Sequence, residues 1–289
     1  MSVDSSGALV CEYCGGRSYF DDKQLLGYKE FRKQMLSYLR GIHDEKSEGD
    51  KSEDYLWDSA EEEQLEMADG DKATIRYLYS YEDGPVKVYL TKNNALFVFS
   101  KSERNLADRM LSGIGMLSFP PADVKGLNEC FPRLNGSYDL SGGGVMLAFA
   151  RSDNLFPLPM FGSLSPEHTA WIVSRLENIC CVLNYSDMIH GGISEEAVWI
   201  NPFNHHAVLM GHWWSASKAS ALKSRTDLDD LRKTAAKTLG IHKSEAPAEM
   251  IRFLEDRSSK DAFEDFEKWD KVIEKGFGGR RFAKMNVNL

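Results

Sequence analysis

The chain has 289 residues, 42% of them hydrophobic and 11% aromatic, which is typical of a folded globular protein and excludes disordered and fibrous classes. No apolar run reaches the roughly 18 residues of a membrane span, and residues 1–16 lack the basic start and apolar middle of a secretory signal. We therefore expect a cytoplasmic protein, in the host cytoplasm or the virion if the source is viral, with no membrane partner. Five cysteines, an odd number, favour free thiols over a disulfide framework.

The negative charge is concentrated in one segment. The formal net charge is −9, and residues 44–69 contain twelve acidic residues and two lysines, so the rest of the chain is close to neutral. The segment is typical of a solvated linker. Because the chain has no basic stripe, we do not expect it to bind nucleic acid directly.

Residues 1–43 form a small opening unit, in which CEYCGG (Cys11 to Gly16) precedes a short amphipathic helix expected over residues 28–42. Cys11 and Cys14 make half of a tetrahedral zinc site. The nearest further ligands, His43 and Cys130, do not form a second close pair. Two interpretations stay open: a zinc knuckle, completed by a partner chain, or two ordinary thiols. Zinc is the only cofactor that the sequence suggests.

Residues 70–152 read as a β-rich lobe. In residues 72–102, β-branched and aromatic residues are interrupted by turn signals at Asp83-Gly84-Pro85 and Asn93-Asn94, which predicts three antiparallel strands. A helix is expected over residues 103–117, and a further strand over residues 142–150.

Residues 153–289 read as a helical lobe. Ser165 fits an N-cap with Pro166 at the first helical position, and apolar residues follow at helical spacing to residue 185. Two short strands, at 195–200 and 205–210, are joined by a turn at 201–204. Three further helices are expected over residues 226–240, 246–259 and 260–277, the first with a capping box of Thr226 and Asp229 and an end at Gly240. The fold class is therefore α+β, with two lobes.

The segment HGGISEEAVWINPFNHHAVLMGHWWS, residues 190–215, has the spacing of a phosphotransferase active site. It resembles the protein-kinase-like superfamily of protein kinases and aminoglycoside phosphotransferases, and its hydrophobic rhythm is similar to that of bacterial and phage members. The resemblance covers residues 70–289 and implies a bilobal fold. It places His190 at the motif histidine, Gly192 at the catalytic Asp, Ala197 at the metal-binding Asn and Gly211 at the second metal-binding Asp. It also implies that Asp227 opens a helix and clamps the catalytic loop.

Those substitutions remove the side chains that phosphoryl transfer needs. The reaction depends on Mg²⁺ held by carboxylate and amide oxygens and on an Asp that orients the acceptor hydroxyl. Gly192, Ala197 and Gly211 supply no side-chain oxygen. Loss of a general base alone costs on the order of 10²–10⁴ in rate. The resemblance therefore implies a kinase-like fold without kinase chemistry.

The nucleotide cradle that the resemblance implies is also degenerate. The segment MADGDKATIRY contains one glycine, Gly70, where several backbone N–H groups should approach the phosphates. The nearest alignment puts Val98 at the phosphate-pairing lysine and Asp108 at its helix partner, with Lys101 or Lys87 as alternatives. We expect weak or absent nucleotide binding.

The remaining polar and thiol residues have structural interpretations that outweigh the catalytic ones. We expect His205 and His206 to point to opposite faces of their hairpin rather than join a metal cluster with His190 and His212. Glu195 and Glu196 read as exposed loop acids rather than displaced bases. Buried packing is expected for Cys180 and Cys181, and space filling for Trp213 and Trp214.

The sequence predicts a catalytically inactive pseudokinase that acts as a protein-binding or scaffolding module, with a partner that it does not identify. Two alternatives stay open. One is a structural component of a larger viral or phage assembly. The other is a phosphotransferase with a displaced active site, in which carboxylates such as Asp187, Glu195 or Glu196 hold the metal.

Overall fold

The computed structural model describes residues 2–3, 9–10, 17–18, 57, 60–120, 126–202, 204–220 and 225–280. Three two-residue strands near the N-terminus, β1 (Ser2–Val3), β2 (Leu9–Val10) and β3 (Arg17–Ser18), pair in antiparallel order. Cys11, Cys14 and the helix expected over residues 28–42 lie outside the described residues. No helix of the described part is long and apolar enough to cross a bilayer.

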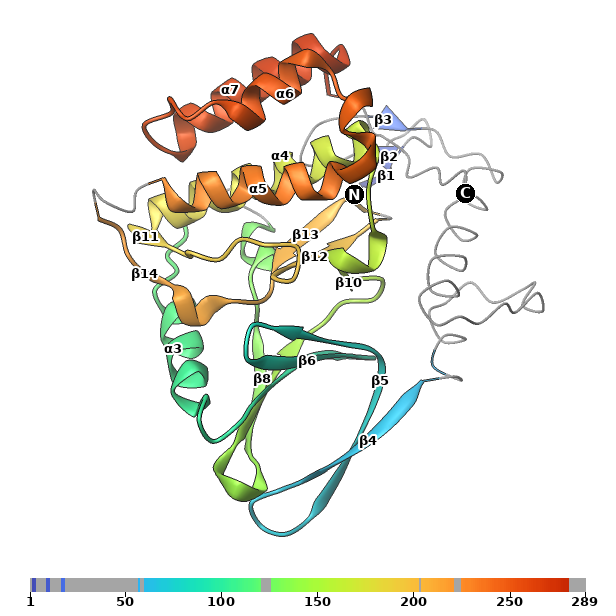
Figure 1. Ribbon diagram of the computed structural model, residues 1–289, viewed down its shortest axis with the longest axis vertical. Coiled ribbons are helices and arrows are strands. Elements are labelled where there is room, and N and C mark those ends of the chain that lie inside the picture. The colour runs from blue at the N-terminus through green and yellow to red at the C-terminus, as the bar shows by residue number, and fades with distance from the viewer. Residues whose placement is uncertain are drawn as a thin grey trace, which may run out of the picture.

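A six-stranded antiparallel sheet forms the lower lobe in Figure 1, with the strand order β4-β5-β6-β7-β9-β8. The three strands expected from residues 72–102 are confirmed as its centre. Gly84, at φ +59°, makes the left-handed turn between the first two of them. The strands are β4 (Glu61–Glu66), β5 (Lys72–Asp83), β6 (Val86–Thr91), β7 (Asn94–Phe99), β8 (Leu134–Asp139) and β9 (Val145–Ala150).

The predicted linker, residues 44–69, is wrong in its last part, because β4 belongs to the sheet. The sequence of β4, EEEQLE, lies inside the acidic segment assigned to residues 44–69, yet it pairs with β5 along its whole length, so the sheet begins before residue 70. Residues of the neighbouring strands contact the glutamates of β4. Glu61 accepts a hydrogen bond from the Tyr77 hydroxyl, and Glu63 forms an ion pair with Lys87. Acidic residues suit an edge strand because they discourage pairing with another chain.

The two faces of the sheet bury different residues. Ala95, Phe97 and Phe99 of β7 belong to the main core, which continues into the helical lobe. Leu96 and Val98 face the opposite way, into a small outer cluster with Tyr89 and Met146. This alternation, which follows from the two-residue period of a strand, decides which β7 side chains can reach a site between the lobes.

Helix α3 (Arg104–Gly115) confirms the helix expected after the third strand. It packs against β7, β9 and the short helix η4 (Trp213–Ser215). A Cβ atom on Gly113 would lie 2.5 Å from the carbonyl oxygen of Trp213, so only glycine allows this close approach.

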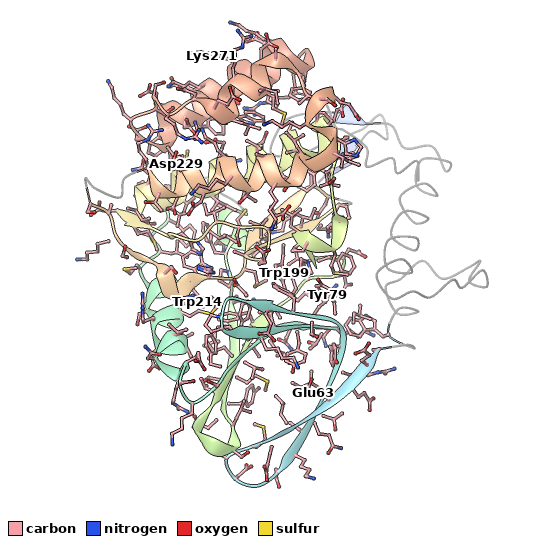
Figure 2. The ribbon with its side chains drawn as sticks, in the orientation of Figure 1. Glu63, Tyr79, Trp199, Trp214, Asp229 and Lys271 are labelled. Carbon is pink, nitrogen blue, oxygen red and sulfur yellow. The ribbon has the colours of Figure 1, made fainter. Side chains whose placement is uncertain are left out.

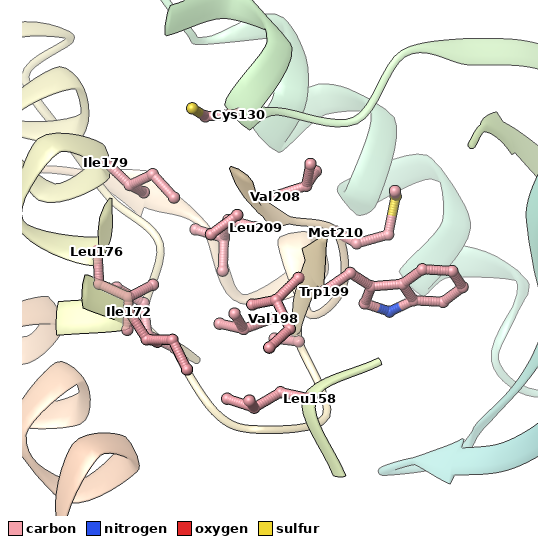
Figure 3. Close-up of a cluster of buried hydrophobic side chains, with 14 of the residues drawn as sticks. Cys130, Leu158, Ile172, Leu176, Ile179, Val198, Trp199, Val208, Leu209 and Met210 are labelled. Carbon is pink, nitrogen blue, oxygen red and sulfur yellow. The ribbon is translucent and has the colours of Figure 1, made fainter. Parts of the chain in front are cut away.

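The upper lobe in Figure 1 is helical, as expected. Ser165 caps α4 and accepts a hydrogen bond from the His168 backbone N–H, while Pro166 occupies the first position. Figure 3 shows Ile172, Leu176 and Ile179 of α4 facing the core with Val198 and Leu209. The helices are α4 (Pro166–Tyr185), α5 (Thr226–Leu239), α6 (Ala248–Glu255) and α7 (Ala262–Phe277), with η3 (Leu158–Phe161) and η5 (Gly240–Glu245) as short connectors.

Short strands lie between the sheet and the helices. The predicted hairpin is confirmed as β12 (Val198–Asn201) and β13 (His206–Leu209), with β10 (Phe156–Pro157) beside β12. A second pair, β11 (Met188–Ile189) and β14 (Ser217–Lys218), flanks it. The loop from β11 to β12 and the segment after β13 carry the candidate site.

The capping box expected at Thr226 and Asp229 is wrong. Helix α5 begins at Thr226 after Arg225, whose side chain makes no cap hydrogen bond. The acid near the start of this helix that bonds backbone N–H groups is Asp227, and it bonds those of another segment. The expected helix end at Gly240 is confirmed, with φ +48°.

Candidate functional site

His190 follows β11 and is completely buried. Its Nε2 lies 3.0 Å from the carbonyl oxygen of Gly211, and its ring packs edge-on against Trp213 at 4.7 Å between centroids. Because a carbonyl oxygen only accepts, Nε2 carries the proton. Burial lowers the pKa of His190 to about 3, so the ring is neutral at physiological pH.

Asp227 holds the loop that follows His190. One carboxylate oxygen accepts from the backbone N–H of His190 at 2.9 Å, and the other accepts from that of Gly191 at 2.7 Å. This is the clamp that the resemblance implied. Burial raises the pKa of Asp227 to about 6, although the two backbone N–H groups act in the opposite direction.

The three positions that the resemblance assigns to two acids and one amide converge. The backbone N–H of Gly211 donates to the carbonyl oxygen of Ala197 at 3.0 Å. A Cβ atom on Gly211 would lie 3.2 Å from the Ala197 Cα, and a Cβ atom on Gly192 would lie 2.1 Å from Cδ2 of His212, the residue after Gly211. The spacing in the sequence therefore reflects proximity in the fold.

Other side chains occupy the space that acids would need there. The His212 ring covers Gly192, and its Nδ1 donates to Asp83 Oδ1 at 3.0 Å. Asp83 is only 3% exposed, and its Oδ2 would lie 2.8 Å from a Cβ atom on Gly211. Within the described residues, this Oδ2 has no hydrogen-bond partner. In the sequence Asp83 is marked only as part of the Asp-Gly-Pro turn between two strands, so it was not a predicted site residue.

Two further hydrogen bonds join the sheet to the helical lobe. The Tyr81 hydroxyl donates to the backbone carbonyl of Glu196 at 2.8 Å and accepts from Trp199 Nε1 at 3.0 Å. Burial raises the pKa of Tyr81 well above its usual range, so it stays a neutral donor. Figure 2 shows Trp199 between the sheet and the helices, and its side chain is fully buried.

The predicted nucleotide-cradle residues do not gather at this site. Val98 lies on the outer face of β7, whereas the fully buried Phe97 faces the site, with one ring carbon 3.6 Å from the Cβ position of Gly211. Gly70 lies in the turn before β5, at the opposite end of that strand from Asp83. The turn that reaches the site is therefore the one between β5 and β6.

The polar alternatives to Val98 also lie elsewhere. Lys87 is on the outer face with Tyr89, paired with Glu63 at 3.0 Å. Lys101 is exposed and packs beside Gly143, and Asp108 is exposed on α3. Lys101 and Asp108 therefore do not form the lysine and acid pair that holds nucleotide phosphates in kinases.

The histidines of the β12–β13 hairpin diverge as expected. His205 stacks on Trp171 of α4 at 4.6 Å, whereas His206 Nε2 contacts the Glu129 carbonyl at 3.1 Å. In the part of the chain that the structure describes, no three histidine, cysteine or acidic side chains group so that they could hold a metal ion.

Glu195 is not the exposed loop acid that was expected. It is 9% exposed, accepts from the Thr238 hydroxyl and pairs with Lys237 at 2.7 Å. Glu196 pairs with the same lysine at 3.1 Å. Burial acts to raise the pKa of its carboxyl, but hydrogen bonds from its own backbone N–H and from Lys237 lower it. Both carboxylates thus share one lysine.

The cysteines and tryptophans serve packing, as expected. Cys180 is buried, and burial raises the pKa of Cys181 to about 12, so neither thiol is ionised at neutral pH. Trp213 and Trp214 are buried, the first donating to the Leu209 carbonyl and the second packing against Phe99.

Comparison with known proteins supports the fold through structure alone. No family model matches the chain, and no curated protein matches it. A rhoptry kinase from Toxoplasma gondii superposes with a TM-score of 0.54 at 10% identity, covering 90% of this chain and 98% of that chain. The chain therefore has a bilobal protein-kinase-like fold.

Two other solved structures are similar at lower scores. The ROP18 kinase domain in complex with AMP-PNP and sucrose gives a TM-score of 0.49 at 12% identity, covering 88% of this chain and 95% of that chain. WbdD in complex with a kinase inhibitor gives 0.49 at 12% identity, covering 69% of this chain and 46% of that chain. This chain thus spans about half of WbdD.

Proposed function

We propose that this chain is a pseudokinase, which uses a kinase-like fold to bind or organise a protein partner and does not transfer phosphate. The observation that carries the proposal is the contact between Gly192 and His212. A side chain at the position of the catalytic Asp would begin 2.1 Å from the His212 ring, so any residue larger than glycine requires that ring to move.

The chemistry of the remaining residues supports the same proposal. Phosphoryl transfer needs carboxylate and amide oxygens that hold Mg²⁺ against the phosphates. Here Gly192, Ala197 and Gly211 supply none, and the nearest carboxylate, Asp83, bonds to His212. Glu195 and Glu196, the candidates for a displaced site, pair with Lys237.

The closed space between the lobes argues against nucleotide binding. Phe97, Asp83 and Trp199 are each at most 3% exposed there, and Tyr81 bonds across from the sheet to the helical lobe. A nucleotide would have to separate these contacts before it could enter.

The test is incubation of the purified chain with labelled ATP, Mg²⁺ or Mn²⁺ and generic protein acceptors. We expect no incorporation above a heat-inactivated sample, and no thermal shift with millimolar Mg-ATP, because a ligand stabilises only in proportion to its binding. Turnover that disappears in Glu195→Gln or Glu196→Gln would contradict the proposal and establish a displaced site.

Affinity purification from the native source, followed by mass spectrometry, tests the partner half of the proposal. A stoichiometric regulatory or enzymatic protein partner is the expected result. Recovery only as part of a viral or phage particle would replace the scaffolding role with a structural one.

A further inference from the structure

The helical lobe contains a cavity that the kinase-like site does not use. It lies along the groove between α4 and α7 and has a volume of about 590 Å³. Small-molecule pockets usually measure about 300–1,000 Å³ and combine apolar walls with a few polar groups. Aromatic and aliphatic side chains from three segments line it: Trp171, His205, Phe266, Ile273 and Phe277.

The walls of this cavity are fixed by contacts behind them. The Trp171 and His205 rings stack at 4.6 Å with 6° between their planes. Arg175 Nε donates to the His205 carbonyl at 2.7 Å, which ties the hairpin turn to α4. Trp269 Nε1 donates to Ser174 at 2.8 Å, which ties α7 to the same helix. A preformed cavity loses little entropy on binding.

The two ends of the cavity differ in charge. Helices α4 and α7 are antiparallel, since Trp269 bonds Ser174 and Ala262 bonds Asn184, so the end of α7 lies beside the start of α4. At that end two exposed acids, Glu167 and Glu245, line the cavity. Glu245 also faces His242 on the surface at 3.0 Å.

At the other end two arginines face one acid. Arg280 pairs with Asp270 and lies over the Phe266 ring, and Arg175 bonds the hairpin turn. The three acids and two arginines that line the cavity sum to a formal charge of −1, and Glu167 and Glu245 lie at the end away from both arginines.

We propose that this cavity binds a small aromatic amine, with its ring against the Trp171, Phe266 and Phe277 walls and its ammonium group toward Glu167 and Glu245. The cavity is large enough for a ligand of one or two fused rings, and aromatic walls favour a flat ring over an aliphatic chain. The inference does not depend on the proposed pseudokinase function.

The experiment compares three probes that share an indole ring with a two-carbon side chain, which ends in an ammonium group, in no further group or in a carboxylate. They are tryptamine, uncharged 3-ethylindole and anionic indole-3-propionate, titrated into the full chain by ligand-observed NMR at low ionic strength. We expect tryptamine to bind most tightly and indole-3-propionate most weakly. Exposed ion pairs are weak, so the preference of tryptamine over 3-ethylindole should be about two- to ten-fold.

Variants locate the binding. Glu167→Gln with Glu245→Gln should abolish the preference for tryptamine and leave 3-ethylindole unchanged. Asn178→Trp, which fills the cavity, and Phe277→Ala, which removes a wall, should each weaken all three probes. Glu274→Gln, an exposed acid of α7 outside the cavity, is the matched control and should change nothing.

Three outcomes would overturn the proposal. They are no binding of any probe at several millimolar, equal affinity for the three probes, and affinities that neither Asn178→Trp nor Phe277→Ala reduces while both variants melt as the parent does.

Discussion

Buried histidines make the stability of this chain sensitive to acid at the level of single residues. Burial lowers the pKa of His190 to about 3 and that of His168 to about 4. In the unfolded chain both would titrate near 6.5. Between those values the unfolded state binds protons that the native state excludes, so stability is complete above about pH 6.5 and is lost as the pH falls.

We predict that His190→Gln flattens this dependence. Each such histidine contributes a slope of up to about 1.4 kcal/mol per pH unit. A glutamine amide can still donate to the Gly211 carbonyl but does not titrate. Urea unfolding at pH 7, 6 and 5 should show the variant losing less stability than the parent. The raised pKa of Asp227 acts in the opposite direction, but it is common to both proteins. Parallel slopes would contradict the prediction.

At the residue scale, local spacing predicted part of the site and could not predict the rest. The resemblance to the kinase-like motif placed His190, Gly192, Gly211 and Asp227 in the sequence. It also placed Val98 at the phosphate-pairing lysine, but successive side chains of a strand point to opposite faces, and in β7 Phe97 rather than Val98 faces the site.

Asp83 was missed for a different reason. Its partner, His212, is 129 residues away in the sequence and belongs to the other lobe. No local pattern contains such a pairing, and only the turn at Gly84 marked the segment as special.

Among the elements, α5 supports the site through its first turn. Asp227 satisfies two backbone N–H groups of the loop after β11, that of the buried His190 and that of the partly buried Gly191. Helical N-termini also favour negative charge, which assists an acid at this position. The loop that carries His190 is thus held by a helix 36 residues further along the chain.

We predict that Asp227→Ala lowers the free energy of unfolding by about 2–4 kcal/mol, because each unsatisfied buried N–H costs about 1–3 kcal/mol. Asp227→Asn should cost less, since one acceptor oxygen remains. Asp230→Ala, on the same helix, removes the ion pair with the exposed Lys233 and should cost at most about 1 kcal/mol. Equal losses in Asp227→Ala and Asp230→Ala would show that the clamp does not contribute to stability.

The helices were more predictable than the strands because their signals are local. Ser165 and Pro166 mark the start of α4, and Gly240 marks the end of α5. Strands β4 and β8 were missed, since EEEQLE and LNGSYD lack apolar alternation and form only against neighbours in the sheet. Edge strands of this kind depend on tertiary pairing rather than on their own sequence.

For the molecule as a whole, the hairpin of β5 and β6 closes the sheet against the helical lobe. Asp83 bonds His212, and Tyr81 bonds both Trp199 and the carbonyl of Glu196. The glycines at positions 192 and 211 are linked to this closure, since His212 fills the space above Gly192 and Asp83 borders Gly211. Larger side chains at these two positions alone would therefore meet His212 and Asp83.

We predict that Gly192→Asp, Ala197→Asn and Gly211→Asp together will destabilise the chain, because the first and third place Cβ atoms 2.1 Å from His212 and 2.8 Å from Asp83. Adding His212→Gly and Asp83→Ala should relieve both contacts, and glycine also suits the φ of +64° at position 212. The quintuple variant should then be stabilised by Mn²⁺, by about 2.7 kcal/mol when the Mn²⁺ concentration is one hundred times its Kd. His212→Gly with Asp83→Ala alone is the control and should not respond to metal. If Mn²⁺ raises the thermal stability of the quintuple variant no more than that of the control, these positions cannot form a metal site. The kinase-like assignment of Gly192, Ala197 and Gly211 would then have to be abandoned.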